Sequence, residues 1–229
     1  MDAKLARLAR STPNFMKPLL RPLYIRYLQL LKINRDELHT YWKNPWDGAN
    51  RPEIYLDGVA RSEFLGQLVG KNVGPDAKIL EIGCNIGRNL NYLFEAGFKN
   101  LHAIEISETA VQLLRETYPE MANCIEICNV PVEDVIKHLG ENEYDLVFTM
   151  AVLEHIHTDS EWIFVEMVRI CKERLITIED ERSVSWRHFP RNYKRVFEEL
   201  GMQQMEEVNC SEVEGLGSVF VARVFRKAV

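Results

Sequence analysis

The chain has 229 residues, 46% of them hydrophobic, which suits one α/β domain with an added segment and excludes global disorder. Its formal net charge of −6 disfavours broad, sequence-independent binding to nucleic acid, because such binding needs a basic face. The sequence has neither an apolar run of about 18 residues nor a secretory signal, so we expect a cytoplasmic protein without a membrane-spanning helix.

Residues 1–33 differ from the rest of the chain, because seven Lys and Arg face a single acid, Asp2. Leucines and tyrosines at helical spacing follow Pro18 and Pro22 and predict an amphipathic helix. Such a helix could pack on the main domain or on a partner subunit, or it could rest on an anionic membrane surface. We favour packing, keep a peripheral membrane contact open, and expect a monomer or a homodimer.

Residues 35–70 contain an aromatic turn, with Trp42 and Trp46 among its members, followed by a predicted helix at Glu53–Val69. The turn could form a lid over a ligand pocket or a hydrophobic plug against a sheet. We therefore predict that residues 1–70 form a helical N-terminal extension or lid, and that residues 71–229 form the principal domain.

Short apolar segments then alternate with amphipathic ones, which is typical of a parallel sheet covered by helices on both faces. The predicted strands are Lys78–Ile82, Leu101–Glu105, Cys124–Cys128, Tyr144–Thr149 and Arg174–Ile178. The predicted helices are Arg88–Ala96, Glu108–Tyr118, Val132–Leu139 and Asp159–Cys171. Ser107 and Gly97 are placed to cap two of these helices.

The end of the chain predicts a helix at Phe189–Leu200 and two strands, Gln203–Cys210 and Ser218–Arg226, joined by a turn that contains glycines. We expect these strands to form a hairpin on one edge of the sheet. The fold class is therefore α/β, a Rossmann-like, doubly wound, mostly parallel sheet of seven strands with an antiparallel C-terminal hairpin. The five cysteines lack CxxC spacing and are expected to be reduced thiols packed in the core, with Cys124 and Cys128 on one face of a strand.

The turn between the first strand and the first helix of this domain reads Glu-Ile-Gly-Cys-Asn-Ile-Gly, from Glu81 to Gly87. A dinucleotide-binding turn would need glycine at positions 85 and 88, where this chain has Asn85 and Arg88. The turn resembles instead the first motif of class I S-adenosylmethionine-dependent methyltransferases, with Asn in place of the middle glycine. Asn tolerates positive φ better than most residues, so the replacement is mild.

The resemblance implies roles for the residues around the turn. Gly83 and Gly87 would let the backbone approach the methionine part of S-adenosylmethionine, and Glu81 would anchor its ammonium group. Glu105, at the tip of the next strand, could accept hydrogen bonds from both ribose hydroxyls. Val132 and Glu133 are the adenine candidates. The predicted cofactor-binding residues are Glu81, Gly83, Cys84, Asn85, Gly87, Glu105, Ile106, Val132, Glu133 and Met150.

The fourth strand runs into Thr149–His157, which lacks the Asn/Asp-Pro-Pro-aromatic motif of enzymes that methylate amino groups of DNA and glutamine. Its Leu-Glu-His-Ile string resembles small-molecule methyltransferases of the ubiquinone-biosynthesis type. Some relatives bind a divalent metal through Glu-x-x-Glu-His. This chain has Ala151 at the first position, so we predict no metal and treat His155 as a candidate catalytic residue.

The segment after the fifth strand, Glu179–Tyr193, combines acids, arginines and aromatic residues, and it should open onto the same rim of the sheet. His188 could accept a proton near neutral pH and is a second catalytic candidate. The predicted substrate-binding residues are Glu179, Asp180, Arg182, Trp186, His188, Arg191 and Tyr193.

These features predict an S-adenosylmethionine-dependent methyltransferase that acts on O or N of a small-molecule acceptor, loosely similar to bacterial enzymes of sugar or secondary metabolism. One alternative is a protein of the same fold that binds the cofactor but serves as a regulatory or scaffold subunit. The other is an NAD-type oxidoreductase, which the glycine spacing disfavours.

Overall fold

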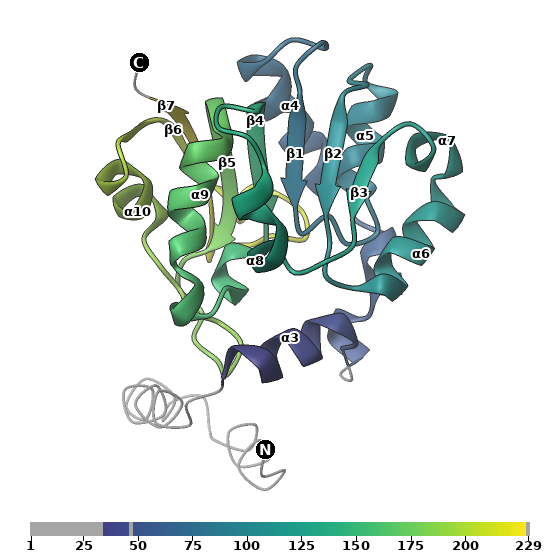
Figure 1. Ribbon diagram of the computed structural model, residues 1–229, viewed down its shortest axis with the longest axis horizontal. Coiled ribbons are helices and arrows are strands. Elements are labelled where there is room, and N and C mark those ends of the chain that lie inside the picture. Colours follow the sequence, from purple (N-terminus) through teal and green to yellow (C-terminus); the bar gives the residue numbers. More distant parts are fainter. Residues whose placement is uncertain (1–33, 46–47, 228–229) are drawn as a thin grey trace, which may run out of the picture.

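The computed structural model describes residues 34–45 and 48–227. The predictions for the basic N-terminal segment and for Trp46 therefore lie outside the described residues. A single seven-stranded sheet in the order β3-β2-β1-β4-β5-β7-β6 forms the centre of the described chain (Figure 1). Its strands are β1 (Ile79–Ile82), β2 (Leu101–Ile104), β3 (Glu126–Cys128), β4 (Tyr144–Met150), β5 (Cys171–Asp180), β6 (Met202–Asn209) and β7 (Phe220–Lys227).

The first five strands are parallel, and β7 pairs antiparallel with both β5 and β6. The predicted fold class, including the antiparallel hairpin at one edge, is thereby confirmed. The near-continuous apolar run of β1 explains its central place, because all four of its residues are buried between helical layers.

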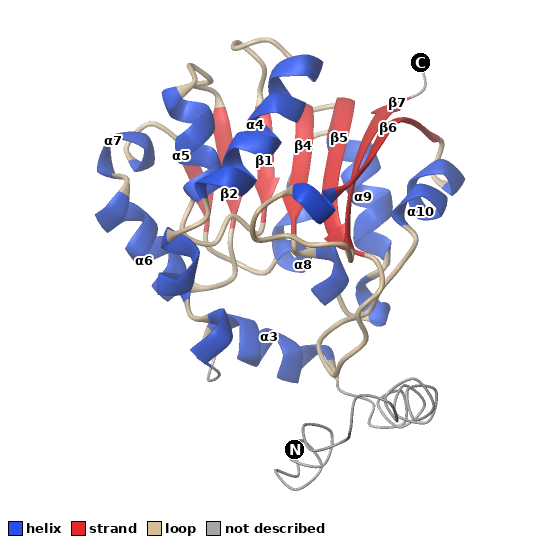
Figure 2. Cartoon of the chain, turned by 180° about the vertical axis from the view of Figure 1, so that it is seen from behind, coloured by secondary structure: helices blue, strands red, loops and turns tan. Residues whose placement is uncertain are grey.

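Helices cover both faces of the sheet (Figure 2). One face packs against α4, α5, α6 and α7, whose buried side chains include Leu65, Leu90, Leu114 and Met121. The other face packs against α8, α9 and α10 through a second cluster that includes Phe164 and Phe197. The helices are α3 (Arg35–Lys43), α4 (Val59–Asn72), α5 (Arg88–Glu95), α6 (Glu108–Thr117), α7 (Pro119–Ala122), α8 (Val132–Val135), α9 (Trp162–Ile170) and α10 (Tyr193–Glu199).

The segment before β1 begins with α3, which the Asn34 side chain caps by accepting a hydrogen bond from the Glu37 N–H. The single helix predicted at Glu53–Val69 is in fact a 3-10 turn, Pro52–Leu56, followed by α4, because Gly58 takes a left-handed conformation between them. Leu65 and Val69 of α4 lie in the main core. The boundary expected at residue 70 therefore falls inside a helix of the domain itself.

Several predicted bounds need correction. The strand β5 begins at Cys171 rather than Arg174, and α10 begins at Tyr193, four residues later than expected, because residues 181–192 form a loop. Cys124 precedes β3, and both Cys124 and Cys128 are exposed, so the expectation of core thiols on one strand face is wrong for this pair.

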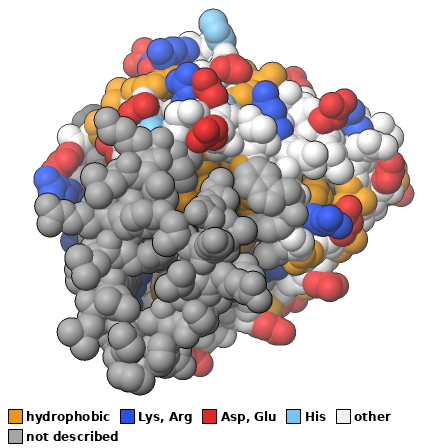
Figure 3. All heavy atoms as spheres, turned by 90° about the horizontal axis from the view of Figure 1, so that it is seen from below, with side chains coloured by type: hydrophobic (Ala, Val, Ile, Leu, Met, Phe, Trp, Pro, Cys, Tyr) orange, Lys and Arg blue, Asp and Glu red, His pale blue; other side chains and the backbone are white. Residues whose placement is uncertain are grey.

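The surface seen from below the strand tips mixes acidic and basic side chains over its described part, with hydrophobic side chains between them (Figure 3). Among the described helices, none is long and apolar enough to cross a membrane.

Candidate active site

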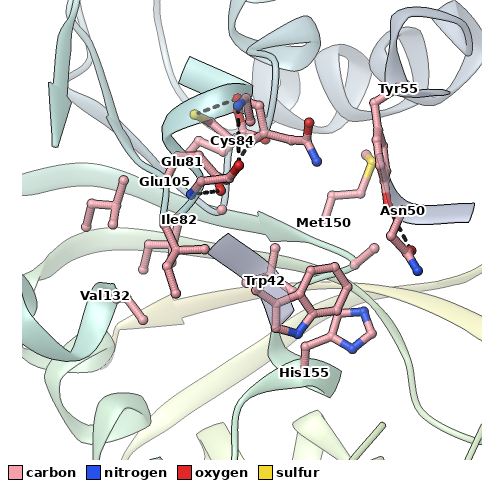
Figure 4. A pocket seen from close by; sticks show the side chains of 18 of the residues that line it. Trp42, Asn50, Tyr55, Glu81, Ile82, Cys84, Glu105, Val132, Met150 and His155 are labelled. Carbon is pink, nitrogen blue, oxygen red and sulfur yellow. Dashed lines mark hydrogen bonds between the residues drawn. The ribbon is translucent and has the colours of Figure 1, made fainter. Parts of the chain in front are cut away.

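A pocket opens at the carboxyl ends of β1, β2 and β4, and α3 lies across this end of the sheet (Figure 1). Its lining comes from the β1–α5 turn, the tips of β2 and β4, the start of α8, and the segment from α3 to α4. Figure 4 shows Glu81, Cys84 and Glu105 gathered on one side of this pocket, while Trp42 and His155 lie against each other on another. Ligands of parallel α/β sheets bind at this position.

The β1–α5 turn has the backbone that the sequence motif requires. Gly83, Asn85 and Gly87 all have positive φ, of 76°, 50° and 73°. A Cβ atom on Gly83 would lie 2.5 Å from Cγ2 of Val152, so the turn needs glycine there for space as well as for conformation. Asn85 thus adopts the conformation expected of a residue that replaces the middle glycine.

Glu81 projects from the end of β1 and is almost fully buried. Its Oε1 accepts a hydrogen bond of 2.8 Å from the Asn89 side chain, but its Oε2 is buried without a partner in the described structure. Burial raises the pKa of Glu81 to about 8, against the opposing effect of the Asn89 hydrogen bond. A buried, unpaired carboxylate oxygen on a pocket wall is the group that a ligand cation would satisfy.

Glu105 follows β2 and is also buried. Its two oxygens accept hydrogen bonds of 2.8 Å from the backbone N–H groups of Asn85 and Ser107, so it ties the two turns together. Burial raises the pKa of Glu105, although both backbone hydrogen bonds act in the opposite direction. The carboxylate can accept further hydrogen bonds, and the residue lines the pocket.

Ile106, Val132 and Glu133 form the side wall beyond Glu105. Glu133 is held by His39 of α3 at 3.0 Å between Oε1 and Nε2. Burial alone would raise the pKa of Glu133, but the contact with His39, together with other hydrogen bonds to the carboxylate, outweighs it and lowers the pKa overall. The contact joins α3 to the start of α8 across the pocket.

The pocket also has a wall from the segment before β1 that sequence reasoning did not assign to it, apart from the suggestion of a lid. Trp42, Asn50, Tyr55 and Arg61 all line the cavity. The side-chain amide of Asn50 donates to the Tyr41 hydroxyl at 2.7 Å, which fixes the wall to α3. These residues carry no motif, so only the general richness of this stretch in aromatic residues could have indicated them.

The loop after β5 lies differently from the prediction. None of the seven predicted substrate residues between Glu179 and Tyr193 lines the pocket. Glu179 instead accepts hydrogen bonds from the Val152 and Leu153 N–H groups, and Asp180 accepts from those of Arg182 and Ser183. Tyr193 is fully buried, and the Trp186 ring packs edge-on against Tyr41 at 4.8 Å. This loop supports the pocket from outside.

Two histidines lie close together at this end of the sheet, His155 after β4 and His188 in the loop after β5. His155 lines the cavity, and its ring lies tilted against that of Trp42 at 4.4 Å between centroids and 4.7 Å from the His188 ring. Burial, helped by His188, lowers the pKa of His155 to about 3, and burial with nearby Arg187 lowers the pKa of His188 to about 4. Both imidazoles are therefore uncharged at neutral pH and too weakly basic to suit the predicted role of proton acceptor.

Comparisons with known proteins add to this geometry. A family model described as a methyltransferase domain matches residues 80–176, from β1 into β5. Residues 80–176 are thus similar to a methyltransferase domain, in agreement with the resemblance seen in the glycine turn. The matched residues include the turn, Glu105 and the tip of β4, while α3 and α4 lie outside the match. No protein of curated function matches the sequence.

Solved structures share the fold of this chain at low sequence identity. Magnesium protoporphyrin IX methyltransferase from Synechocystis PCC 6803, with bound S-adenosylhomocysteine, is 15% identical, with a TM-score of 0.67 over 85% of this chain and 100% of that one. Geranyl diphosphate C-methyltransferase from Streptomyces coelicolor A3(2), solved with Mg²⁺, is 14% identical, with a TM-score of 0.59 over 74% and 76%. The 4+2 cyclase SpnF is 13% identical, with a TM-score of 0.60 over 73% and 81%.

Arg191 fastens the loop after β5 to the body of the domain. Its guanidinium donates to the carbonyl oxygens of Leu153, Ile156 and Phe189 and pairs with Glu161 at 2.9 Å. We expect Arg191→Ala to lower the free energy of unfolding by about 2 to 4 kcal/mol, because several carbonyl groups lose a charged donor. Thermal unfolding should show this as a loss of roughly 5 to 15 °C.

The matched control is Arg195→Ala, since Arg195 is exposed and its side chain pairs, within the described part of the chain, only with Glu199 one helical turn away. Its effect should stay within about 0.5 kcal/mol. An Arg191→Ala protein that melts like the wild type would show that Arg191 does not hold the loop.

Proposed function

We propose that this protein transfers the methyl group of S-adenosylmethionine to an oxygen or nitrogen atom of a small-molecule acceptor. The observation that carries the proposal is the unpaired, buried Oε2 of Glu81 beside a glycine turn, on the same pocket as the Glu105 carboxylate. Glu81 would receive the ammonium group of the cofactor and Glu105 the ribose hydroxyls. Ile106, Val132 and Glu133 would border the adenine, and Met150 would lie near the sulfur.

Two arginines suit the carboxylate end of the same cofactor. Arg61 lines the pocket, and its Nε is buried without a partner in the described structure. Arg88 is held by Ser62 and by the carbonyl oxygens of Tyr55 and Asp57, and burial together with Arg61 lowers its pKa to about 10. Two cations close enough to disfavour each other would be stabilised by an anion between them. We assign this role to the methionine carboxylate.

The acceptor would enter beside Trp42, Tyr55 and His155, where aromatic side chains exclude water. The nucleophilic atom of the acceptor would attack the methyl carbon in line with the breaking carbon–sulfur bond. S-adenosylhomocysteine would leave as a neutral thioether, and the acceptor's proton would pass to solvent. Orientation of two reactants can contribute about 7 to 11 kcal/mol, so the reaction does not depend on a strong base.

We infer the class of acceptor from the walls of the pocket and from the substrates of structurally similar proteins. The titles of two neighbours name a porphyrin and a prenyl diphosphate as substrates, which are both small molecules. A pocket whose walls include apolar and aromatic side chains suits an acceptor of this size. We assign the reaction to the cytoplasm, where the five free cysteines would stay reduced.

Titration calorimetry with S-adenosylhomocysteine over pH 6 to 9 tests the proposal. Glu81 in the free protein is mostly protonated below its pKa of about 8. The bound ammonium needs the carboxylate, so binding must release a proton. We expect the affinity to rise as pH increases towards 8, by at most about tenfold per unit, and then to level off. Proton release should appear as a dependence of the heat on the buffer.

Glu81→Gln keeps the shape of the side chain and cannot titrate, so it should bind at least about tenfold more weakly and lose the pH dependence. NAD serves as the control ligand and should not bind. The proposal is wrong if neither S-adenosylmethionine nor S-adenosylhomocysteine binds the folded protein. Methyl transfer from labelled cofactor to metabolite extracts then separates an enzyme from a subunit that only binds the cofactor.

A further inference from the structure

Three side chains from two distant parts of the chain form a donor cluster behind the acceptor end of the pocket. Glu154 and His155 follow β4, and His188 belongs to the loop after β5. One potential ligand atom of each lies within 4.8 Å of the others. We propose that Glu154, His155 and His188 bind a divalent transition-metal ion.

A hydrogen bond to a second polar atom orients each of the three donors, from the backbone for two of them and from a serine hydroxyl for His188. His155 Nδ1 lies 2.7 Å from the Arg187 carbonyl oxygen, so this nitrogen carries the proton and Nε2 has the free lone pair. His188 Nδ1 is engaged by the Ser185 hydroxyl at 2.6 Å, and Glu154 Oε2 accepts from the Asp180 N–H at 3.4 Å. Metal-binding histidines almost always have their second nitrogen held in this way.

The contact between His155 and Glu154 points in the same direction. Nε2 of His155 faces Oε1 of Glu154 at 3.9 Å, with no hydrogen bond between them. Burial and nearby Glu179 raise the pKa of Glu154. When Glu154 is ionised and the imidazole is neutral and protonated on Nδ1, both atoms are acceptors. A cation between them would convert an unfavourable approach into two bonds. Ligand atoms around a zinc ion lie about 3 to 4 Å apart, so the cluster needs to contract only slightly.

The donor set also selects the ion. Two imidazoles and one carboxylate suit Zn²⁺, Fe²⁺, Co²⁺ or Ni²⁺, whereas Mg²⁺ and Ca²⁺ prefer oxygen ligands. Three protein ligands leave at least one position open, which is the arrangement of catalytic rather than structural sites. Because His155 lines the pocket, the open position would face the acceptor.

The sequence led us to expect no metal, because one of the three donors is far from the other two in the chain. We predicted no metal because position 151 lacks a carboxylate, and Ala151 indeed offers no ligand. The third donor comes instead from His188, 33 residues after His155 in the chain. Only the path of the loop, which Arg191 fastens beside the end of β4, brings the two histidines together.

The inference deepens the proposed function, because an ion at this place could hold an acceptor oxygen close to the methyl group and lower its pKa. Metal binding itself can be measured without cofactor or acceptor. The two proposals can therefore fail separately.

The test uses the full chain after treatment with a chelator. Because exposed Cys124 and Cys128 could bind a soft ion themselves, both are first replaced by serine. We expect one Zn²⁺ or Co²⁺ per chain by calorimetry and elemental analysis, and Mg²⁺ binding at least about 100-fold weaker. Bound Co²⁺ should give the visible absorption of a site with nitrogen and oxygen ligands.

His155→Ala and His188→Ala should each weaken Zn²⁺ binding at least about 100-fold, whereas His138→Ala, at an exposed histidine, should leave it unchanged. The His188→Ala protein must still bind S-adenosylhomocysteine, which shows that it is folded. Two results would overturn the proposal: no stoichiometric binding of any transition ion, or equal affinity in the wild type and both histidine variants.

Discussion

Glu105→Ala is expected to weaken the binding of S-adenosylhomocysteine at least about 100-fold. In the proposed complex each carboxylate oxygen accepts one ribose hydroxyl, and a hydrogen bond to a charged group contributes about 1.5 to 3 kcal/mol. The substitution also frees the N–H groups of Asn85 and Ser107, which the carboxylate now holds at 2.8 Å. Calorimetry measures the affinity, and thermal unfolding without ligand measures the damage to the turn.

Two further variants separate these contributions. Glu105→Gln keeps an oxygen for one of the two N–H groups and should recover part of the stability, but not the affinity of a charged acceptor. Glu108→Ala removes an exposed acid from the same helix start and should change neither quantity. Unaltered affinity in Glu105→Ala would contradict the ribose assignment.

Gly83→Ala should be the most disruptive change of a single atom in the pocket. At a φ of 76° any side chain costs about 1 to 2 kcal/mol, and the new Cβ would lie 2.5 Å from Cγ2 of Val152. Val is stiff and cannot swing away, so we expect a total loss of about 2 to 5 kcal/mol in the free energy of unfolding. Cofactor affinity should fall at least about tenfold, because Val152 also lines the pocket. Denaturant unfolding and calorimetry measure the two effects.

Gly97 provides a matched control, because its φ is 102° but a Cβ there would meet nothing within 4 Å. Gly97→Ala should therefore show the conformational cost alone. Adding Val152→Ala to Gly83→Ala should relieve the clash and leave the conformational cost. If Gly83→Ala and Gly97→Ala lose the same stability, the contact with Val152 carries no energy.

The sequence predicted helices, strands and turns well where residues close together in the chain determine them, such as helix caps and glycine turns. Ser107 caps its helix by accepting from the Ala110 N–H, and Gly97 has the positive φ expected after a helix. The turn at Gly83 and the acid at the tip of β2 also follow from short-range spacing. Strand ends were less certain, because β5 continues into Asp180 through pairing with β7, which no local pattern encodes.

The remainder of the pocket could not be predicted, because it depends on contacts between distant residues. His39 meets Glu133, 94 residues further along the chain, and nothing in either neighbourhood indicates the other. Whether the loop after β5 binds the substrate depends on such distant contacts too. Its composition suits a substrate site. However, Arg191 in this loop and Asp180 at the end of β5 form hydrogen bonds with backbone atoms of the protein itself.

The position of α3 has a thermodynamic consequence. The helix contacts the cofactor side of the pocket through His39 and Glu133, and the opposite side through Trp42 and His155. If a ligand on one side stabilises this position of α3, it must favour a ligand on the other side by the same factor by which that ligand favours the first, since such coupling is reciprocal. The methyl donor and its acceptor would then bind cooperatively, without touching a common residue of the sheet.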